Sequence, residues 1–216
     1  MSADVDNPFF ARLWTAMSGH ETEEMRRLRA ANLAGLAGRV LEVGAGTGTN
    51  FAYYPPAVTE VVAIEPERRL AARAREAAAQ APVPVTVAMD SVEDFSTAEP
   101  FDTAEPFDAV VCSLVLCSVD DLDGVLRELN SLLRPGGELR YLEHIAETGA
   151  RAGLQRVADA TVWPRMMGNC HTHRHTETAI TAAGFRVEEA RRERMLPSWV
   201  PLPVSELAVG RAVRPA

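Results

Sequence analysis

The sequence predicts an α/β fold with a seven-stranded, mostly parallel sheet, helices on both faces and an antiparallel last strand. Between residues 40 and 145, short apolar segments rich in β-branched residues alternate with helical segments, the pattern of parallel strands joined by crossover helices. Two strand-like segments then follow one another, from 185 onward and near 207–213, which favours an antiparallel arrangement at one edge. With 216 residues, 47% of them hydrophobic, the chain can form one domain with a full core.

Composition narrows the class of protein. The formal net charge of −8 argues against a nucleic-acid binder, which needs a basic face against phosphates. All 22 basic residues are arginine, so no lysine is present for Schiff-base chemistry. Three cysteines do not make a disulfide scaffold and suit a reducing compartment. Because residues 1–7 lack signal-peptide features and no stretch reaches about 20 apolar residues, we expect a cytoplasmic protein without stable membrane insertion.

The first 37 residues predict a helical cap. Asn7 followed by Pro8 reads as a helix start, with Asn7 as N-cap and Pro8 at the first helical position. A second helical pattern runs from about 21 to 36. We favour two helices that cover the sheet edge; a lid over a site, carrying Trp14, is the alternative.

The first predicted strand, 40–43, runs into a loop with glycine at every second position. Gly44, Gly46 and Gly48 allow the backbone to approach a ligand where a β-carbon would clash. The nearest template is the dinucleotide fingerprint, but the third glycine comes one residue early. An acidic residue, Glu42, also lies just before the first glycine.

The second strand, 61–64, ends at Glu65, which lies 21 positions after Gly44. An acidic residue at this distance can accept hydrogen bonds from ribose hydroxyls, so the spacing predicts a nucleoside pocket. Alternatively, Glu65 caps the next helix (about 67–80) with Pro66 at its first position, and both roles are compatible.

The remaining strands place more polar residues at the same sheet edge. A third strand, 83–89, leads into Asp90, and a six-residue tandem repeat at 97–108 reads as a tolerated loop duplication before the fourth strand, 108–113. A helix over 122–133 stops at the turn 134–137, and the fifth strand ends in Glu143 and His144.

The C-terminal third predicts an insertion followed by the strand pair. An amphipathic helix and an apolar patch fall within 150–168, a helix lies near 176–183, and a proline-rich loop covers 197–203. We divide the single domain into a cap (1–37), a core (38–145), an insertion or lid with a helix (146–183) and a C-terminal strand pair (184–216).

These motifs resemble the class I S-adenosylmethionine (SAM) methyltransferases over roughly 38–145, through the glycine loop with Glu42 and the segment Leu-Arg-Pro-Gly-Gly at 133–137. More closely, the chain resembles the methyltransferase-like 7 group, whose animal members are thiol S-methyltransferases and which has soluble bacterial relatives. The shared segments are 41–48, 54–56, 114–119, 133–137, 143–144 and 169–171 with Arg174. The chain departs from the group at His173 and His175, and we expect it to lack the animal proteins' N-terminal anchor.

The resemblance implies a Rossmann-like class I methyltransferase fold that binds SAM. The loop after the third strand then contacts the adenine. The candidate cofactor-binding residues are Glu42, Gly44, Gly46, Gly48, Asn50, Glu65, Pro66, Asp90, Ser91, Val92, Ser113, Leu114 and Val115.

Methyl transfer from a sulfonium needs alignment and exclusion of water, and a nucleophile with a free lone pair. A thiol is already a few per cent ionised at neutral pH, whereas a phenol gains more from a base. We predict His144 as that base; a structural histidine is the equal alternative. The candidate substrate-contacting residues are Trp14, Cys117, Trp163, Met167, His171, His173 and Trp199.

His171, His173 and His175 alternate beside Cys170, a pattern that could serve a metal, the substrate or a polar loop before a helix. We favour the loop and expect no metal, because methyl transfer of this kind requires none. Cys112 and Cys117 are expected to be small buried side chains rather than nucleophiles.

The sequence therefore predicts a SAM-dependent methyltransferase acting on a small molecule, with a thiol acceptor preferred. O-, N- or C-methylation of a natural product and a catalytically silent SAM-binding protein are the alternatives. The oligomeric state is left open.

Overall fold

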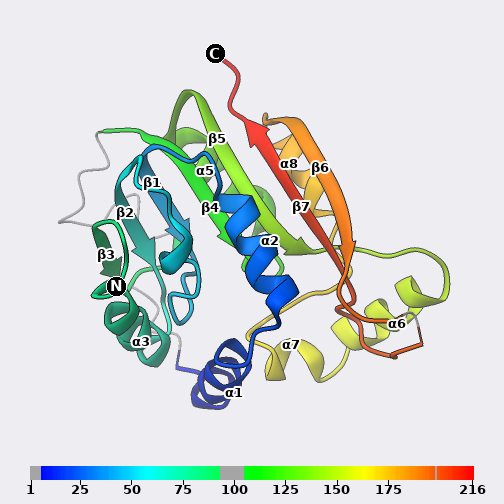
Figure 1. Ribbon diagram of the computed structural model, residues 1–216. Helices are drawn as coiled ribbons and strands as arrows, with labels where there is room; N and C mark the ends of the chain where they lie inside the picture. Colours follow the sequence, from blue (N-terminus) through cyan, green and yellow to red (C-terminus); the bar gives the residue numbers. More distant parts are fainter. Residues whose placement is uncertain (1–5, 93–104, 198) are drawn as a thin grey trace.

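The computed structural model describes residues 6–92, 105–197 and 199–216. Within these residues, a seven-stranded sheet has the order β3-β2-β1-β4-β5-β7-β6 (Figure 1). The strands are β1 (Gly38–Val43), β2 (Val58–Ile64), β3 (Val85–Ala88), β4 (Phe107–Ser113), β5 (Leu133–His144), β6 (Arg186–Arg194) and β7 (Glu206–Val213). Strands β1 to β5 pair in parallel, and β7 is antiparallel to both β5 and β6. The predicted mostly parallel sheet with an antiparallel last strand is confirmed.

Helices cover both faces of the sheet, and the alternation of side chains along each strand decides what each face packs against. In β1, Val40 packs in the cluster that includes Leu33 of α2 (Glu23–Leu33) and Ala74 of α3 (Arg68–Ala78). Its neighbour Leu41 packs on the other face, with the apolar side of α5 (Leu122–Leu132) and α8 (Thr176–Ala182). Figure 1 shows α2 crossing one face while α5 and α8 lie behind the sheet.

A capping side chain precedes each of the helices α1 (Pro8–Ser18), α2 and α3. α1 begins as predicted, because the Asn7 side chain accepts a hydrogen bond from the Phe10 N–H at 3.0 Å. α2 begins two residues later than predicted, after the N-cap Thr22. The alternative role for Glu65 is wrong, because Glu67 is the N-cap of α3 and accepts from the N–H groups of Arg69 and Leu70.

The turn predicted at 134–137 is also wrong, because these residues lie inside β5. α5 still ends just before them, at Leu132. Gly136 has φ +75°, and the pairing of β5 with β4 shifts register between Phe107 and Ala109. The proline and glycines therefore end the helix but make an irregular strand start instead of a separate turn. The first copy of the tandem repeat lies outside the described residues.

Three helices lie beyond the carboxyl ends of the parallel strands: α1, α6 (Gly149–Asp159) and α7 (Trp163–Met166) (Figure 1). Ligands of open α/β sheets bind at this edge. In the part of the chain that is described, no helix has the length and apolar character needed to cross a membrane.

Candidate functional site

The glycine loop after β1 is held between two other parts of the chain. Gly44 and Gly46 have φ +64° and +57°, in the left-handed region where a side chain is strained. A β-carbon on Gly44 would lie 2.4 Å from Cγ2 of Val115, and one on Gly46 would lie 2.7 Å from Nε1 of Trp14. The glycines are thus required by the chain's own close packing at these two positions, whereas the sequence suggested the approach of a ligand.

Trp14 belongs to α1, so that helix lies directly against the loop. The Thr47 hydroxyl also donates to the Ser18 hydroxyl at the end of α1, at 3.0 Å. α2 instead packs across the sheet face. The two N-terminal helices therefore have different positions, and α1 lies where a lid would.

Glu65 closes the other side of the loop. Its Oε2 accepts from the Gly46 N–H at 2.8 Å, and its Oε1 accepts from the Glu67 N–H at 2.9 Å. Burial raises the pKa of Glu65 to about 7, against the opposing effect of these two hydrogen bonds. Each carboxylate oxygen keeps a second lone pair that another donor can use. Pro66 follows directly, before α3.

Glu42 anchors a buried network beneath the loop. The Tyr54 hydroxyl donates to its Oε2 at 2.6 Å, and Nδ2 of Asn50 donates to its Oε1 at 3.1 Å. Asn50 also receives a hydrogen bond from Arg29 of α2 at 2.9 Å and donates to the Ser113 hydroxyl at 3.1 Å. Burial raises the pKa of Glu42 to about 7. The network joins α2, β1 and the end of β4.

Arg29 was not among the sequence candidates. Its side chain is only 2% exposed and forms an ion pair with Glu21 at 2.7 Å. No sequence signal distinguishes it from the neighbouring arginines 26 and 27, which are exposed.

Glu143, at the end of β5, holds the loop after β4. Its Oε1 accepts from the N–H groups of Val115 and Leu116, both at 3.0 Å. Its Oε2 is buried and has no hydrogen-bond partner among the described residues. Burial raises the pKa of Glu143 to about 7. Leu114, at the start of this loop, has φ +60°, a strained conformation that costs about 1–3 kcal/mol and is typical of functional sites.

The segment after β3 reaches the same edge. Val92 is buried in the core cluster that also holds Ile64 and Leu116. Asp90 and Ser91 are partly buried beside it in the sequence. The predicted adenine-contacting residues therefore follow the strand that pairs with β2, and one of them enters the core.

His144 faces two cysteine side chains. Its Nδ1 lies 3.8 Å from Sγ of Cys117 and 3.8 Å from Sγ of Cys170. Both cysteines are buried and form no disulfide, whereas His144 is partly exposed. The contact with Cys170, together with burial, raises the pKa of the Cys117 thiol well above its usual range. The ligand atoms of the three residues all lie within 4.8 Å of one another. We call these residues the Cys-His-Cys cluster.

The segment 169–174 is bonded firmly to the loop after β4. The His171 N–H donates to the Cys117 carbonyl at 2.7 Å, and the Arg174 guanidinium donates to the Leu116 carbonyl at 2.9 Å. Nδ2 of Asn169 donates to the Ser118 carbonyl and to Asp120, both at 2.8 Å. These bonds hold Cys170 beside Cys117, although the two residues are more than 50 positions apart in the sequence.

The three alternating histidines do not form a group of possible metal ligands among the described residues. They lie in the irregular segment before α8, and His175 is its N-cap residue. His173 and His175 meet edge to face, with ring centroids 5.4 Å apart. The favoured expectation, a polar loop before a helix, describes this segment.

The remaining substrate candidates differ in exposure. Nε1 of Trp163 is buried without a hydrogen-bond partner in the described part of the chain. Met167 is partly buried, but Trp199 is 81% exposed. Trp199 therefore does not line an enclosed site in this structure.

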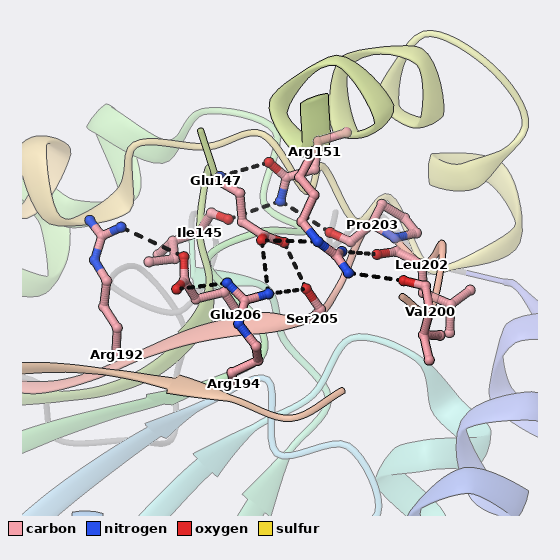
Figure 2. Close-up of polar contacts among 11 residues, drawn as sticks. Ile145, Glu147, Arg151, Arg192, Arg194, Val200, Leu202, Pro203, Ser205 and Glu206 are labelled. Carbon is pink, nitrogen blue, oxygen red and sulfur yellow. Dashed lines mark hydrogen bonds and ion pairs between the residues drawn. The ribbon is translucent and has the colours of Figure 1, made fainter. Parts of the chain in front are cut away.

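A further buried carboxylate, Glu147, lies just after β5 and has a structural role (Figure 2). Glu147 accepts from the Ser205 hydroxyl at 2.8 Å and pairs with Arg194 at 3.3 Å and Arg151 at 3.6 Å. Gln155 of α6 donates to the carbonyl of Pro203 at 3.0 Å. These bonds tie α6 and the proline-rich loop to the end of β5, which positions the insertion at the site.

Comparisons with known proteins identify the family of the chain. A family profile described as a methyltransferase domain matches residues 17–190. Mouse thiol S-methyltransferase TMT1B is 34% identical over 96% of this chain and 85% of its own length. Human TMT1B is 31% identical, again over 96% of this chain and 85% of its own length. Human TMT1A is 30% identical over 82% of this chain and 74% of its own length.

Solved structures share the fold at low identity. The N-methyltransferase NodS of Bradyrhizobium japonicum, in complex with S-adenosylhomocysteine, superposes with a TM-score of 0.63 at 19% identity, covering 98% of this chain and 90% of NodS. The [4+2]-cyclase SpnF has a TM-score of 0.64 at 18% identity, over 89% of this chain and 80% of SpnF. Because one fold holds such different reactions, these two show the architecture only. The family profile and the relatives above 30% identity show that the chain belongs to the class I SAM-dependent methyltransferases, in the methyltransferase-like 7 group.

Proposed function

We propose that the protein transfers the methyl group of SAM to the sulfur of a small-molecule thiol. Bound SAM supplies a methyl group on a sulfonium, which is activated toward an in-line nucleophile. The observation that carries the proposal is the arrangement of the sheet edge: buried carboxylates around the glycine loop at one end, and the Cys-His-Cys cluster at the other.

The carboxylates suit SAM better than a dinucleotide. Glu42, Glu65 and Glu143 are buried acceptors, and the described contacts of Glu65 and Glu143 are with backbone N–H groups. Acceptors match the ribose hydroxyls and the cationic groups of SAM, while they would repel a pyrophosphate. We assign Glu65 to the ribose.

We assign the other cofactor residues by their position along the edge. Gly44, Gly46, Gly48 and Asn50 form the loop, and Pro66 follows Glu65. Asp90, Ser91 and Val92 are assigned to the adenine, and Ser113, Leu114 and Val115 to the part of SAM nearest the methyl group.

The acceptor end begins at Val115. Its side chain contacts the position above Gly44, and Cys117 follows two residues later. His144 is our proposal for the group that promotes ionisation of the acceptor, and a general base at Nε2 is the simplest form of that role. Trp14, Trp163, Met167, His171 and His173 are proposed to surround the acceptor, and Trp199 to contact it only if its loop closes.

A thiol acceptor is favoured by two considerations. The relatives that match between 82% and 96% of this chain are named thiol S-methyltransferases. A thiol is also partly ionised at neutral pH. Alignment of its sulfur with the methyl group and exclusion of water can therefore supply most of the rate acceleration. Nothing about the site requires a strong base.

The test measures binding and turnover separately. SAM at about 100 times its dissociation constant should raise the free energy of unfolding by about 2.7 kcal/mol. The enzyme should then convert small alkyl and aryl thiols to thioethers while releasing S-adenosylhomocysteine. Methylation of phenols or amines but not thiols would show O- or N-methylation instead. SAM binding with no turnover on any of the three panels would show a silent SAM-binding protein.

A further inference from the structure

The Cys-His-Cys cluster has the composition of a transition-metal site. Two thiols and an imidazole, all nearly or partly buried, present Sγ, Sγ and Nδ1 within 4.8 Å of one another. Thiolate and imidazole ligands together select zinc and related ions. The sequence predicts no metal at the alternating histidines. The structure instead brings Cys170 beside Cys117 and His144, which are distant from it in the sequence.

The spacing of the cluster agrees with a tetrahedral ion. Zinc bonds of about 2.3 Å to sulfur and about 2.0 Å to nitrogen give S···N edges of about 3.5 Å in a tetrahedron. Both Sγ···Nδ1 distances are 3.8 Å. Movements of a few tenths of an ångström would therefore bring all three ligands into bonding range.

The backbone already holds the ligands in place. His144 is the last residue of β5, and Glu143 beside it holds the loop that carries Cys117. Asn169 and the His171 N–H fix Cys170 to the same loop. Because the ligands are already held in place, binding of the ion costs little conformational entropy.

We propose that Cys117, His144 and Cys170 bind one zinc ion through Sγ, Nδ1 and Sγ, and that the open fourth position takes the acceptor thiol as a thiolate. Three protein ligands with one open position are typical of catalytic rather than structural zinc. The proposal rests on thiol methylation as the proposed function, and it makes His144 a ligand instead of a base.

Methyl transfer to a zinc-bound thiolate needs no reactant besides SAM and the thiol. Zinc displaces the two cysteine protons to solvent, which yields a neutral Zn²⁺–dithiolate centre. The acceptor R–SH loses its proton to water as its sulfur binds the ion. The sulfur lone pair then forms the bond to the methyl carbon, while the C–S bond to the sulfonium breaks and its electron pair stays on that sulfur. The thioether product is a weaker ligand than the thiolate and leaves.

The first experiment measures zinc in purified, fully reduced protein after removal of free metal. Wild type should hold about one ion per chain. C117S and C170S should each hold at least tenfold less under the same conditions, since serine is a poor zinc ligand at neutral pH. C112A is the matched control: Cys112 is buried at the end of β4, outside the cluster, so its zinc content should equal that of wild type. A SAM-induced rise in melting temperature checks that each variant is folded.

The second experiment tests the open position without turnover. Cobalt(II) in place of zinc should give thiolate charge-transfer absorption that C117S and C170S weaken. Adding a small thiol should shift this absorption, and adding the matching alcohol should not. Zinc content unchanged in both serine variants, a Cys117–Cys170 disulfide with no metal uptake after reduction, or cobalt absorption indifferent to thiol would each overturn the proposal.

Failure of the metal site and failure of the proposed function are separable. Methylation of thiols at full rate after zinc removal would overturn the metal site and leave thiol methylation intact. Zinc uptake and a thiol-dependent cobalt spectrum, with no thiol methylated in the presence of SAM, would support the site and overturn the proposed function.

Discussion

The two ends of the functional sheet edge are built in different ways. At the end we assign to the cofactor, Glu42 bonds Asn50 eight residues away, and Glu65 bonds Gly46 nineteen residues away. At the end we assign to the acceptor, the Cys-His-Cys cluster joins residues 26 and 27 positions apart, and the Arg174–Leu116 bond spans 58. The carboxylate contacts of the first end lie within one β-α-β unit, although Asn50 also bonds Ser113 of β4 and Gly44 packs against Val115. The second end exists only after the sheet and the insertion have come together.

Their chemistry differs as well. The cofactor end gathers carboxyl groups whose pKa burial has raised to about 7. The acceptor end gathers soft ligands, two thiols and an imidazole. Substitutions at one end should therefore change SAM binding, and substitutions at the other should change acceptor chemistry alone.

The largest effect is expected for Gly44→Ala. An alanine held at φ +64° would have a backbone conformation that costs about 1–2 kcal/mol, and its β-carbon would lie 2.4 Å from Cγ2 of Val115. Because the loop must move, SAM affinity should fall at least 100-fold by calorimetry. Gly35→Ala is the matched control: it has φ +78° but nothing within 4 Å of its β-carbon, so it should lose stability and keep SAM affinity. Equal SAM affinity in the two variants would contradict the close-packing argument.

The second largest effect is expected for Asn169→Gly, which should impair the acceptor end and leave the cofactor end unchanged. Asn169 has φ +64°, and glycine keeps that backbone conformation while removing the two side-chain bonds to the loop at 118–120. Asn169→Gly should lower the rate of thiol methylation and the zinc affinity about tenfold, and leave SAM affinity within twofold. A loss of SAM affinity as large as the loss of rate would mean that the two ends are not separate.

A third prediction uses the raised pKa of Glu143, whose folded value of about 7 exceeds the ordinary 4.5. The folded protein then binds the proton more tightly, so this group's stabilisation is present below pH 4.5 and is lost as pH rises through 7. The shift corresponds to roughly 3 kcal/mol. Urea unfolding of the apoprotein should give a free energy that falls between pH 5 and 8.

Glu143→Gln removes one of three such groups, the others being Glu42 and Glu65. The fall in its unfolding free energy between pH 5 and 8 should be about a third smaller than in wild type. The same substitution at the exposed Glu24 should leave the fall unchanged. A Glu143→Gln curve parallel to wild type would contradict the raised pKa.

The difference between the two ends explains what the sequence could predict. Glu42 and Glu65 follow directly from strand ends and spacing, because the residues that they bond are near in sequence. The glycines follow from their own spacing, but Val115 and Trp14, which pack against them, do not. Cys170 beside His144 could not be found this way, since no periodicity connects 144 with 170. Arg29 was missed because one buried arginine in an arginine-rich helix looks like its exposed neighbours. At 134–137, proline and glycine end α5 as predicted, yet the segment forms an irregular part of β5, where the register with β4 shifts between Phe107 and Ala109.

The smallest effect is expected for Trp199→Ala, and it tests how far the acceptor end extends. The side chain is 81% exposed, so its loss should change the free energy of unfolding by less than about 0.5 kcal/mol. If the proline-rich loop does not close over the acceptor, KM for a small thiol should change less than threefold. The loop is fixed by Arg151, which donates to the carbonyls of Val200 and Leu202 at 2.9 and 3.1 Å. A tenfold rise in KM with unchanged stability would instead show that Trp199 reaches the acceptor, and would extend the acceptor end of the edge to this loop.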